Sequence, residues 1–294
     1  RLYRSRDMRN TGDSEFYHLP QNALSVGSAF ATLPDNVVTM YPDNIPDSWL
    51  GLPSENFLAV PRFRLCRMAL GRLWIGNLHD APGTVRPSEP NFWGTFVAGN
   101  DLTPDSTAEI MGMWSVTDGL LICTLGSSFI VRASDDGQRF RYSPLSKTVG
   151  CAAPNSMETM PTGLVVWLGL DGFYGYDGNS VSFLSPNLRR TFKRVTSRMR
   201  QAVAVFDARS REYRCWVSLD GAEENNTCFV FDGKSWRTRT DVVVTSACST
   251  KDFRQYTLVG GHLPGDENHS GVYLLDHDAS PDIPALVKDR EAIV

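Results

Sequence analysis

One short phrase recurs five times along this chain of 294 residues: a small residue, a run of aromatic and aliphatic residues, then a polar turn. The phrase begins at Gly71, Ser128, Gly172, Cys228 and Gly271, in steps of 57, 44, 56 and 43 residues with a mean near 50. That length is typical of four-stranded propeller blades, each of which needs neighbours to bury both its faces. The repeat therefore predicts an all-β protein, a β-propeller of about five or more four-stranded blades.

Strand-like runs of β-branched, aromatic and leucine residues dominate the sequence, separated by clusters of Gly, Asp, Asn, Ser and Pro. Where they cluster, their spacing of about ten residues is typical of antiparallel meanders. Asp177-Gly178 and Asp232-Gly233 predict tight hairpin turns. A β-sandwich or a set of unrelated meanders is the alternative. The clearest strand candidates span residues 72–76, 119–125, 129–132, 163–168, 172–176, 202–206, 213–218, 228–231, 256–260 and 271–275.

Two domains are expected, with a boundary after residue 58. Residues 1–58 contain two possible strands, at residues 2–4 and 15–18, followed by a connector that holds Pro42, Pro46 and Pro53. This pattern indicates the end of a small β-sandwich and a Pro-rich linker, and residues 59–294 would form the propeller. The start at Arg1 and the apolar end of the sequence suggest a segment of a longer polypeptide.

Composition excludes several classes of protein. The chain is 41% hydrophobic and 21% charged, which allows a sizeable core, and its net charge of −4 does not favour polyanion binding by the whole surface. No apolar run approaches the roughly 20 residues of a membrane span, so we expect no membrane partner. Six scattered cysteines without a CxxC pair indicate small buried core residues rather than a disulfide framework or a zinc site.

No catalytic motif is present. The sequence lacks a P-loop, a GxSxG elbow and an HExxH motif, so we expect no enzymatic activity, cofactor or metal. His262, His269 and His277 lie near acidic residues, but their spacing matches no standard ligand pattern and indicates a solvated loop. Residues 134–140 resemble the Asp-box turn of sialidase-type propellers, which is a structural hairpin.

The one helix candidate is also the most basic segment. Over residues 187–201, Leu188, Phe192, Val195 and Met199 recur at steps of four, three and four. Such a helix could contact DNA phosphates or an acidic neighbouring subunit, or could be a solvated basic face. Six positive charges fall within twelve residues, at Arg189, Arg190, Lys193, Arg194, Arg198 and Arg200.

Loose patterns occur at residues 45–53, 62–76, 82–93, 149–151, 163–167, 171–176 and 184–186. Through these segments most of residues 1–200 resembles the tail-hub, nozzle or tail-tubular proteins of short-tailed phages. The resemblance implies a fibronectin-like domain before the propeller and a virion protein, made in the host cytoplasm, that forms a homo-oligomeric ring. Six copies is one expectation for that ring. DNA would pass through it during ejection, with transient contact, and adjacent tail or portal-adaptor proteins would be its neighbours.

Two other functions remain open. A carbohydrate-binding or glycan-degrading propeller would show exposed aromatics and paired carboxylates at one mouth, whereas the seven tryptophans here lie mostly in strand-like runs. A generic propeller scaffold for protein partners would be a monomer in solution.

Overall fold

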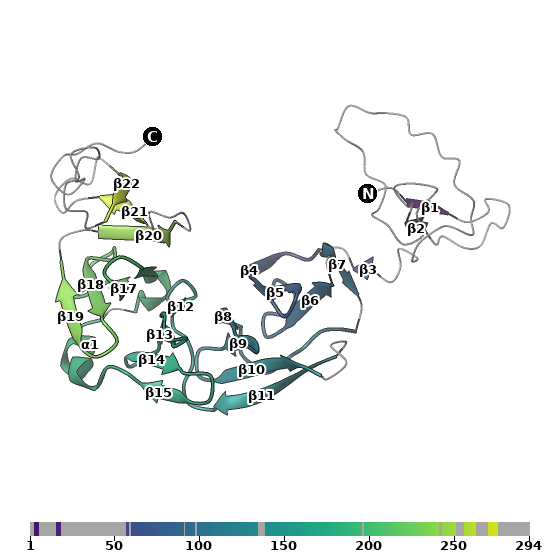
Figure 1. The fold of residues 1–294 in the computed structure, drawn as a ribbon, viewed down its shortest axis with the longest axis horizontal. Helices are drawn as coiled ribbons and strands as arrows, with labels where there is room; N and C mark the ends of the chain where they lie inside the picture. The colour runs from purple at the N-terminus through teal and green to yellow at the C-terminus, as the bar shows by residue number, and fades with distance from the viewer. Residues whose placement is uncertain are drawn as a thin grey trace. The chain divides into compact units, whose positions relative to one another are not determined.

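The chain is an all-β protein, a five-bladed β-propeller of four-stranded antiparallel blades (Figure 1). In this computed structural model it divides into two compact units, residues 1–61 with 87–101, and residues 62–86 with 102–294. The structure describes residues 3–5, 16–18, 57–58, 60–90, 92–97, 99–134, 139–195, 197–240, 243–250, 256–262 and 270–275.

The larger unit holds the blades, in which consecutive strands are antiparallel neighbours. The first blade begins with β4 (Phe63–Ala69) and β5 (Arg72–Leu78) and continues into β6 (Val85–Glu89). The second consists of β8 (Gly112–Val116), β9 (Gly119–Cys123), β10 (Ser128–Ala133) and β11 (Phe140–Ser146). The third consists of β12 (Glu158–Thr159), β13 (Val165–Leu168), β14 (Phe173–Tyr176) and β15 (Val181–Phe183). The fourth consists of β16 (Val203–Asp207), β17 (Glu212–Val217), β18 (Thr227–Phe231) and β19 (Trp236–Arg239). The described strands of the fifth are β20 (Val243–Ser249), β21 (Thr257–His262) and β22 (Gly271–Leu274).

The smaller unit contains short pairs of strands. β1 (Tyr3–Ser5) pairs with β2 (Phe16–His18), and β3 (Phe57–Leu58) pairs with β7 (Phe92–Val97). The last residues of β6 also pair with β7. The predicted sandwich and linker over residues 1–58 lie mostly outside the described residues and stay a prediction, while the division of the chain falls after Pro61.

The core lies between neighbouring blades, because the central strands are buried on both faces. In β13, Val165 and Trp167 pack with the second blade, while Val166 and Leu168 pack with the fourth. This alternation with a period of two explains why the strand reads as a continuous apolar run. Packing between blades therefore buries what a single blade would expose.

The repeat is confirmed, but its first copy lies on a different strand of the blade from the other four. The phrase falls on the third strand in four blades, whereas the copy at Gly71 falls on β5, the second strand of the first blade. The third strand there is β6, whose sequence Val-Arg-Pro-Ser-Glu lacks the aromatic run. Third strands begin at 85, 128, 173, 227 and 271, in steps of 43, 45, 54 and 44 residues. One of these steps alone is long, so the alternation of long and short steps seen in the sequence phrase does not recur in the third strands.

That long step contains the predicted helix over 187–201, which is not one helix. The chain forms a 3₁₀ turn (Pro186–Leu188), the four-residue α1 (Arg189–Phe192) and a second 3₁₀ turn (Met199–Gln201). Leu188 and Phe192 are buried in the core as predicted. Val195 instead forms a β-bridge with Leu219. Helix α1 is a single turn without a side-chain cap, so tertiary contacts override the helical pattern.

Candidate functional site

The six basic residues that were predicted as an interface are not brought together as one unpaired face. Arg194 Nε donates to Asp220 Oδ1 at 2.8 Å, and Arg200 Nη1 donates to Glu109 Oε1 at 2.8 Å. Arg198 Nη2 donates to Glu223 Oε1 at 3.2 Å. The bonds from Arg194 and Arg200 hold the pKa values of Asp220 and Glu109, respectively, below their usual range.

The other three basic residues are exposed. Arg189 lies over the Phe183 ring at 5.5 Å, and Arg190 and Lys193 have no polar partner in the described part of the chain. Half of the predicted positive charge is thus matched within the chain, which weakens the attraction of this segment for a phosphate backbone.

An apolar groove lies beside these ion pairs. A cavity of about 410 Å³ is lined by turns of the second and third blades and by the segment before β16. Leu125 is 44% exposed and Leu170 is 54% exposed. An exposed apolar centre with a charged rim is the usual anatomy of a protein–protein contact. The groove residues are Met111, Leu125, Ala152, Leu170, Val195 and Met199, with Glu109 and Arg200 at the rim.

A second cavity, the central cavity, is lined by the first strand of every blade. Its volume is about 540 Å³. The first strands of successive blades contact one another at β4 and β8, at β12 and β16, and at β16 and β20. The lining residues are Arg67, Trp114, Asn155, Met157, Glu158, Val203, Ala204, Thr245, Ser246, Ala247, Cys248 and Ser249.

Arg67 is fixed in this cavity by an aromatic ring and a carbonyl. Its Cζ lies 3.7 Å from the centroid of Trp114, and its Nε donates to the Met113 carbonyl at 3.3 Å. Trp114 is itself held, because its Nε1 donates to Thr159 Oγ1 at 2.7 Å. Arg67 is accessible from the cavity, yet the surrounding atoms shield its guanidinium from bulk water and lower the pKa of Arg67.

Glu158 supplies the cavity with a carboxyl that titrates near neutral pH. Burial raises the pKa of Glu158 to about 7, and the nearby Arg67 only partly offsets this shift. In the residues that the structure describes, its carboxylate forms no ion pair. The central cavity therefore combines a permanent positive charge with a carboxyl that exists in both protonation states at neutral pH.

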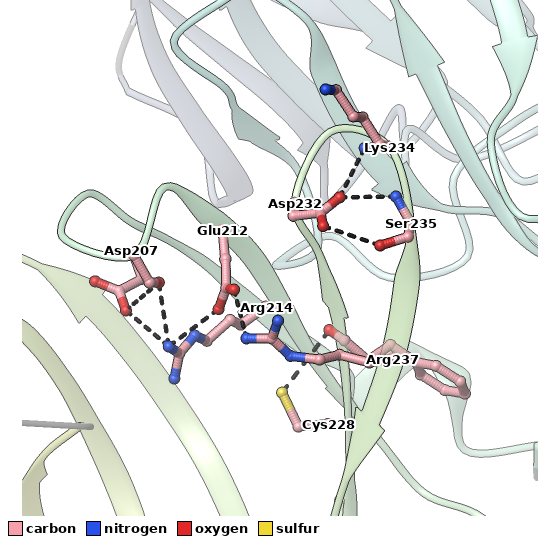
Figure 2. Close-up of polar contacts among 10 residues, drawn as sticks. Asp207, Glu212, Arg214, Cys228, Asp232, Lys234, Ser235 and Arg237 are labelled. Atoms are coloured by element: carbon pink, nitrogen blue, oxygen red, sulfur yellow. Dashed lines mark hydrogen bonds and ion pairs between the residues drawn. The ribbon is translucent and has the colours of Figure 1, made fainter.

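A different set of charges is buried between the fourth and fifth blades (Figure 2). Arg214 Nη2 lies 2.9 Å from Asp207 Oδ2 and 3.2 Å from Glu212 Oε2, and Arg237 pairs with Glu212 as well. The Thr257 hydroxyl of the fifth blade donates to Asp207 at 3.1 Å. The side chains of Arg214, Asp207 and Glu212 are at most 8% exposed. Two carboxylates and two guanidiniums balance one another, which indicates a structural role.

The predicted Asp-Gly turns are confirmed as structural elements. Asp232 Oδ1 accepts bonds from the backbone N–H groups of Lys234 and Ser235 (Figure 2), and these bonds lower the pKa of Asp232 to about 2. Asp177 makes the same contacts in the third blade, and Gly178 and Gly233 have φ values of 98° and 94°. The carboxylates are committed to their own turns.

Other sequence-derived candidates have mixed outcomes. The predicted burial is wrong for Cys66 and Cys248, which are exposed, Cys248 in the central cavity, whereas the other four cysteines are buried. His269, His277 and residues 135–138 lie outside the described residues. The prediction of a solvated loop is wrong for His262, which is buried at the end of β21 and contacts Glu224 Oε2 at 2.7 Å. Among the residues that the structure describes, no three His, Cys, Asp or Glu side chains gather as a metal site. No helix in the described ranges is long and apolar enough to cross a membrane.

Sequence reasoning missed the central cavity, although a signal for it exists. Arg67, Trp114, Glu158, Val203 and Ser246 follow one another in steps of 47, 44, 45 and 43 residues, close to the spacing of the third strands. A search for residues repeated at this spacing in successive blades would have grouped them.

No family model matches the sequence, and no curated protein matches it either. Among solved structures, the chain is similar to the Pan2 WD40 domain of Neurospora crassa, with 11% identity and a TM-score of 0.43 over 72% of this chain and 62% of that one. It is also similar to Hsv2 of Kluyvelomyces marxianus, with 8% identity and a TM-score of 0.43 over 71% of this chain and 61% of that one. The chain is similar as well to the N-terminal domain of Nup159, with 12% identity and a TM-score of 0.38 over 75% of this chain and 60% of that one. The chain thus spans about three fifths of each. At these scores the fold rests on the strand pairing and not on the likeness.

Proposed function

We propose that this protein is a structural component of a phage tail, in which copies of the chain form a ring through which DNA passes. The propeller fold is consistent with a scaffold that binds its partners through its outer surface and through the turns between its strands. The finer role is supported by the segments that resemble tail-hub and nozzle proteins, residues 62–76, 82–93 and 149–176. Tail or portal-adaptor proteins would be the neighbours, and the role would not be enzymatic.

The structural observation that supports assembly is the apolar groove. Leu125 and Leu170 expose about half of their surface beside the paired Arg200 and Glu109. We assign the groove to contact with a second copy of the chain, since a ring needs one surface to meet a different surface of the next subunit. The basic segment then contributes its ion-paired rim to a subunit contact.

Negative-stain microscopy and mass photometry of the purified chain test this proposal. We expect rings of one discrete mass for the wild type. Leu170→Asp should yield monomers at the same concentration, because it places a charge in the apolar centre of the contact. The matched control is Lys234→Glu in the exposed Asp232 turn, at the other end of the strands, which should leave the rings intact. A wild type that stays strictly monomeric at micromolar concentration would contradict the proposal.

A further inference from the structure

The central cavity contains an arginine whose charge no described carboxylate matches. Arg67 is oriented by the Trp114 ring and by the Met113 carbonyl. Its two terminal nitrogens make no hydrogen bond or ion pair with any other residue that the structure describes. A shielded guanidinium loses part of its hydration, and hydrogen bonds to a bound anion would replace the lost hydrogen bonds to water.

Further hydrogen-bond donors line the same cavity. Asn155, Ser246 and Ser249, whose side chains carry an amide and two hydroxyls, are among the residues that line it. Within the described ranges, none of these three side chains is hydrogen-bonded to another residue. The cavity therefore presents one cation and several neutral donors, a set that suits a ligand rich in acceptor oxygens.

The titratable groups around the cavity do not cancel the charge of Arg67. Glu158 lies near enough to influence Arg67 electrostatically, but burial leaves its carboxyl partly protonated at neutral pH. Burial and, to a smaller extent, the nearby Glu158 raise the pKa of Tyr213, whose hydroxyl donates to the Ser156 carbonyl at 2.7 Å. Cys248 is the remaining titratable side chain in the lining. Protonated Glu158 would act as one more donor, whereas ionised Glu158 would repel an anion.

We propose that the central cavity binds a small oxyanion, a carboxylate or phosphate group, with Arg67 as its positively charged anchor. The planar guanidinium can bind two oxygens of such a group at once. The volume of about 540 Å³ lies within the range of small-molecule sites. A single chain supplies the whole site, so the inference goes beyond the proposed tail role and does not depend on assembly.

A neutral saccharide fits the cavity less well. Saccharides stack their apolar faces on open aromatic rings, but the guanidinium of Arg67 covers a face of Trp114. The positive charge would also contribute little to a neutral ligand. The chemistry on the walls thus favours an anion.

Isothermal titration calorimetry on the full chain, at constant ionic strength, tests the proposal with inorganic phosphate, succinate and glucose as probes. We expect saturable binding of phosphate, of succinate or of both, with one site per chain. Binding of phosphate alone would identify a phosphate-bearing ligand, and binding of succinate alone an organic acid. Arg67→Gln should weaken binding about tenfold or more. The control Arg190→Gln removes an exposed arginine outside the cavity and should change nothing.

Two more variants keep the test decisive if Arg67→Gln does not fold. Ser246→Ala combined with Ser249→Ala should weaken anion binding several-fold, because two neutral donors are lost. The wild-type affinity should fall between about pH 6 and pH 8 as Glu158 ionises, and Glu158→Gln should abolish this dependence. Absence of saturable anion binding to the folded wild type, binding of glucose alone, or equal affinities in Arg67→Gln and Arg190→Gln would overturn the proposal.

Discussion

Two arginines of this propeller lie near glutamates in opposite electrostatic situations. Arg214, between the fourth and fifth blades, contacts both Asp207 and Glu212 and is almost fully buried. Arg67, in the central cavity, lies over an indole ring and contacts no described carboxylate. The comparison teaches that a charge matched inside the core is committed to the structure, whereas a charge that is oriented but unmatched stays available to a ligand.

The largest expected effect is at the matched charge. Arg214→Met would leave Asp207 and Glu212 buried without their shared partner, and should lower the free energy of unfolding by about 3–5 kcal/mol. Urea denaturation at neutral pH measures this loss.

Arg67→Met is the counterpart that could break the comparison. Because Arg67 has no described carboxylate partner and lies at the cavity surface, its replacement should change the unfolding free energy by less than about 1 kcal/mol. Equal losses for Arg67→Met and Arg214→Met would show that both arginines are structural.

The next effect concerns pH. Because folding raises the pKa of Glu158 from 4.5 to about 7, the folded state binds an extra proton between these values. The contribution of Glu158 to stability is fully present below pH 4.5 and is lost as pH rises through about 7. Relative to wild type, Glu158→Gln should gain about 3 kcal/mol between pH 4.5 and pH 8, at about 1.4 kcal/mol per pKa unit. Urea curves at both pH values measure the gain, and parallel behaviour of the two proteins would contradict it.

A smaller effect is expected where the fifth blade touches the buried network. Thr257→Val keeps the shape of the side chain but removes the hydrogen bond to Asp207. A bond to a charged acceptor contributes about 1.5 kcal/mol or somewhat more. Thermal unfolding should therefore show a moderate loss, and an unchanged midpoint would mean that this contact does not join the two blades.

The smallest effect is expected at the exposed rim. Arg200→Gln removes the pair with Glu109, in which both side chains are at least one third exposed. Such pairs contribute less than about 1 kcal/mol and weaken with salt. A loss comparable to that of Arg214→Met would show that the rim, and not the buried network, stabilises the propeller.

The fold was largely predictable because packing between blades requires apolar strands and specific turn residues, and both are visible in the sequence. Runs such as 119–123 and 213–217 are buried on both faces, and Asp-Gly pairs mark the turns. The prediction failed where tertiary contacts override local pattern. β6 lacks the apolar signature of a third strand, and Val195 left a helical pattern to form a bridge with Leu219.

The candidate site was less predictable, because its residues come from five strands. The density of positive charge predicted a site at residues 189–200. The sequence does not reveal that Asp220, Glu223 and Glu109 pair with three of the six basic residues. Arg67 and Glu158 are single charges in separate strands, and only the circular arrangement of blades brings them to one cavity. Such sites depend on packing, which no local window of sequence contains.

The most direct test of the comparison is the stabilisation of the folded protein by an oxyanion. Unfolding free energies of the wild type and of Arg67→Gln would be measured with and without phosphate or succinate, at matched ionic strength. An anion at ten times its wild-type Kd should stabilise the wild type by about 1.4 kcal/mol, and Arg67→Gln, which binds about tenfold or more weakly, by about 0.4 kcal/mol or less. Equal stabilisation of both proteins, or no stabilisation of the wild type by either anion, would contradict the claim that the unmatched charge of Arg67 marks a binding site.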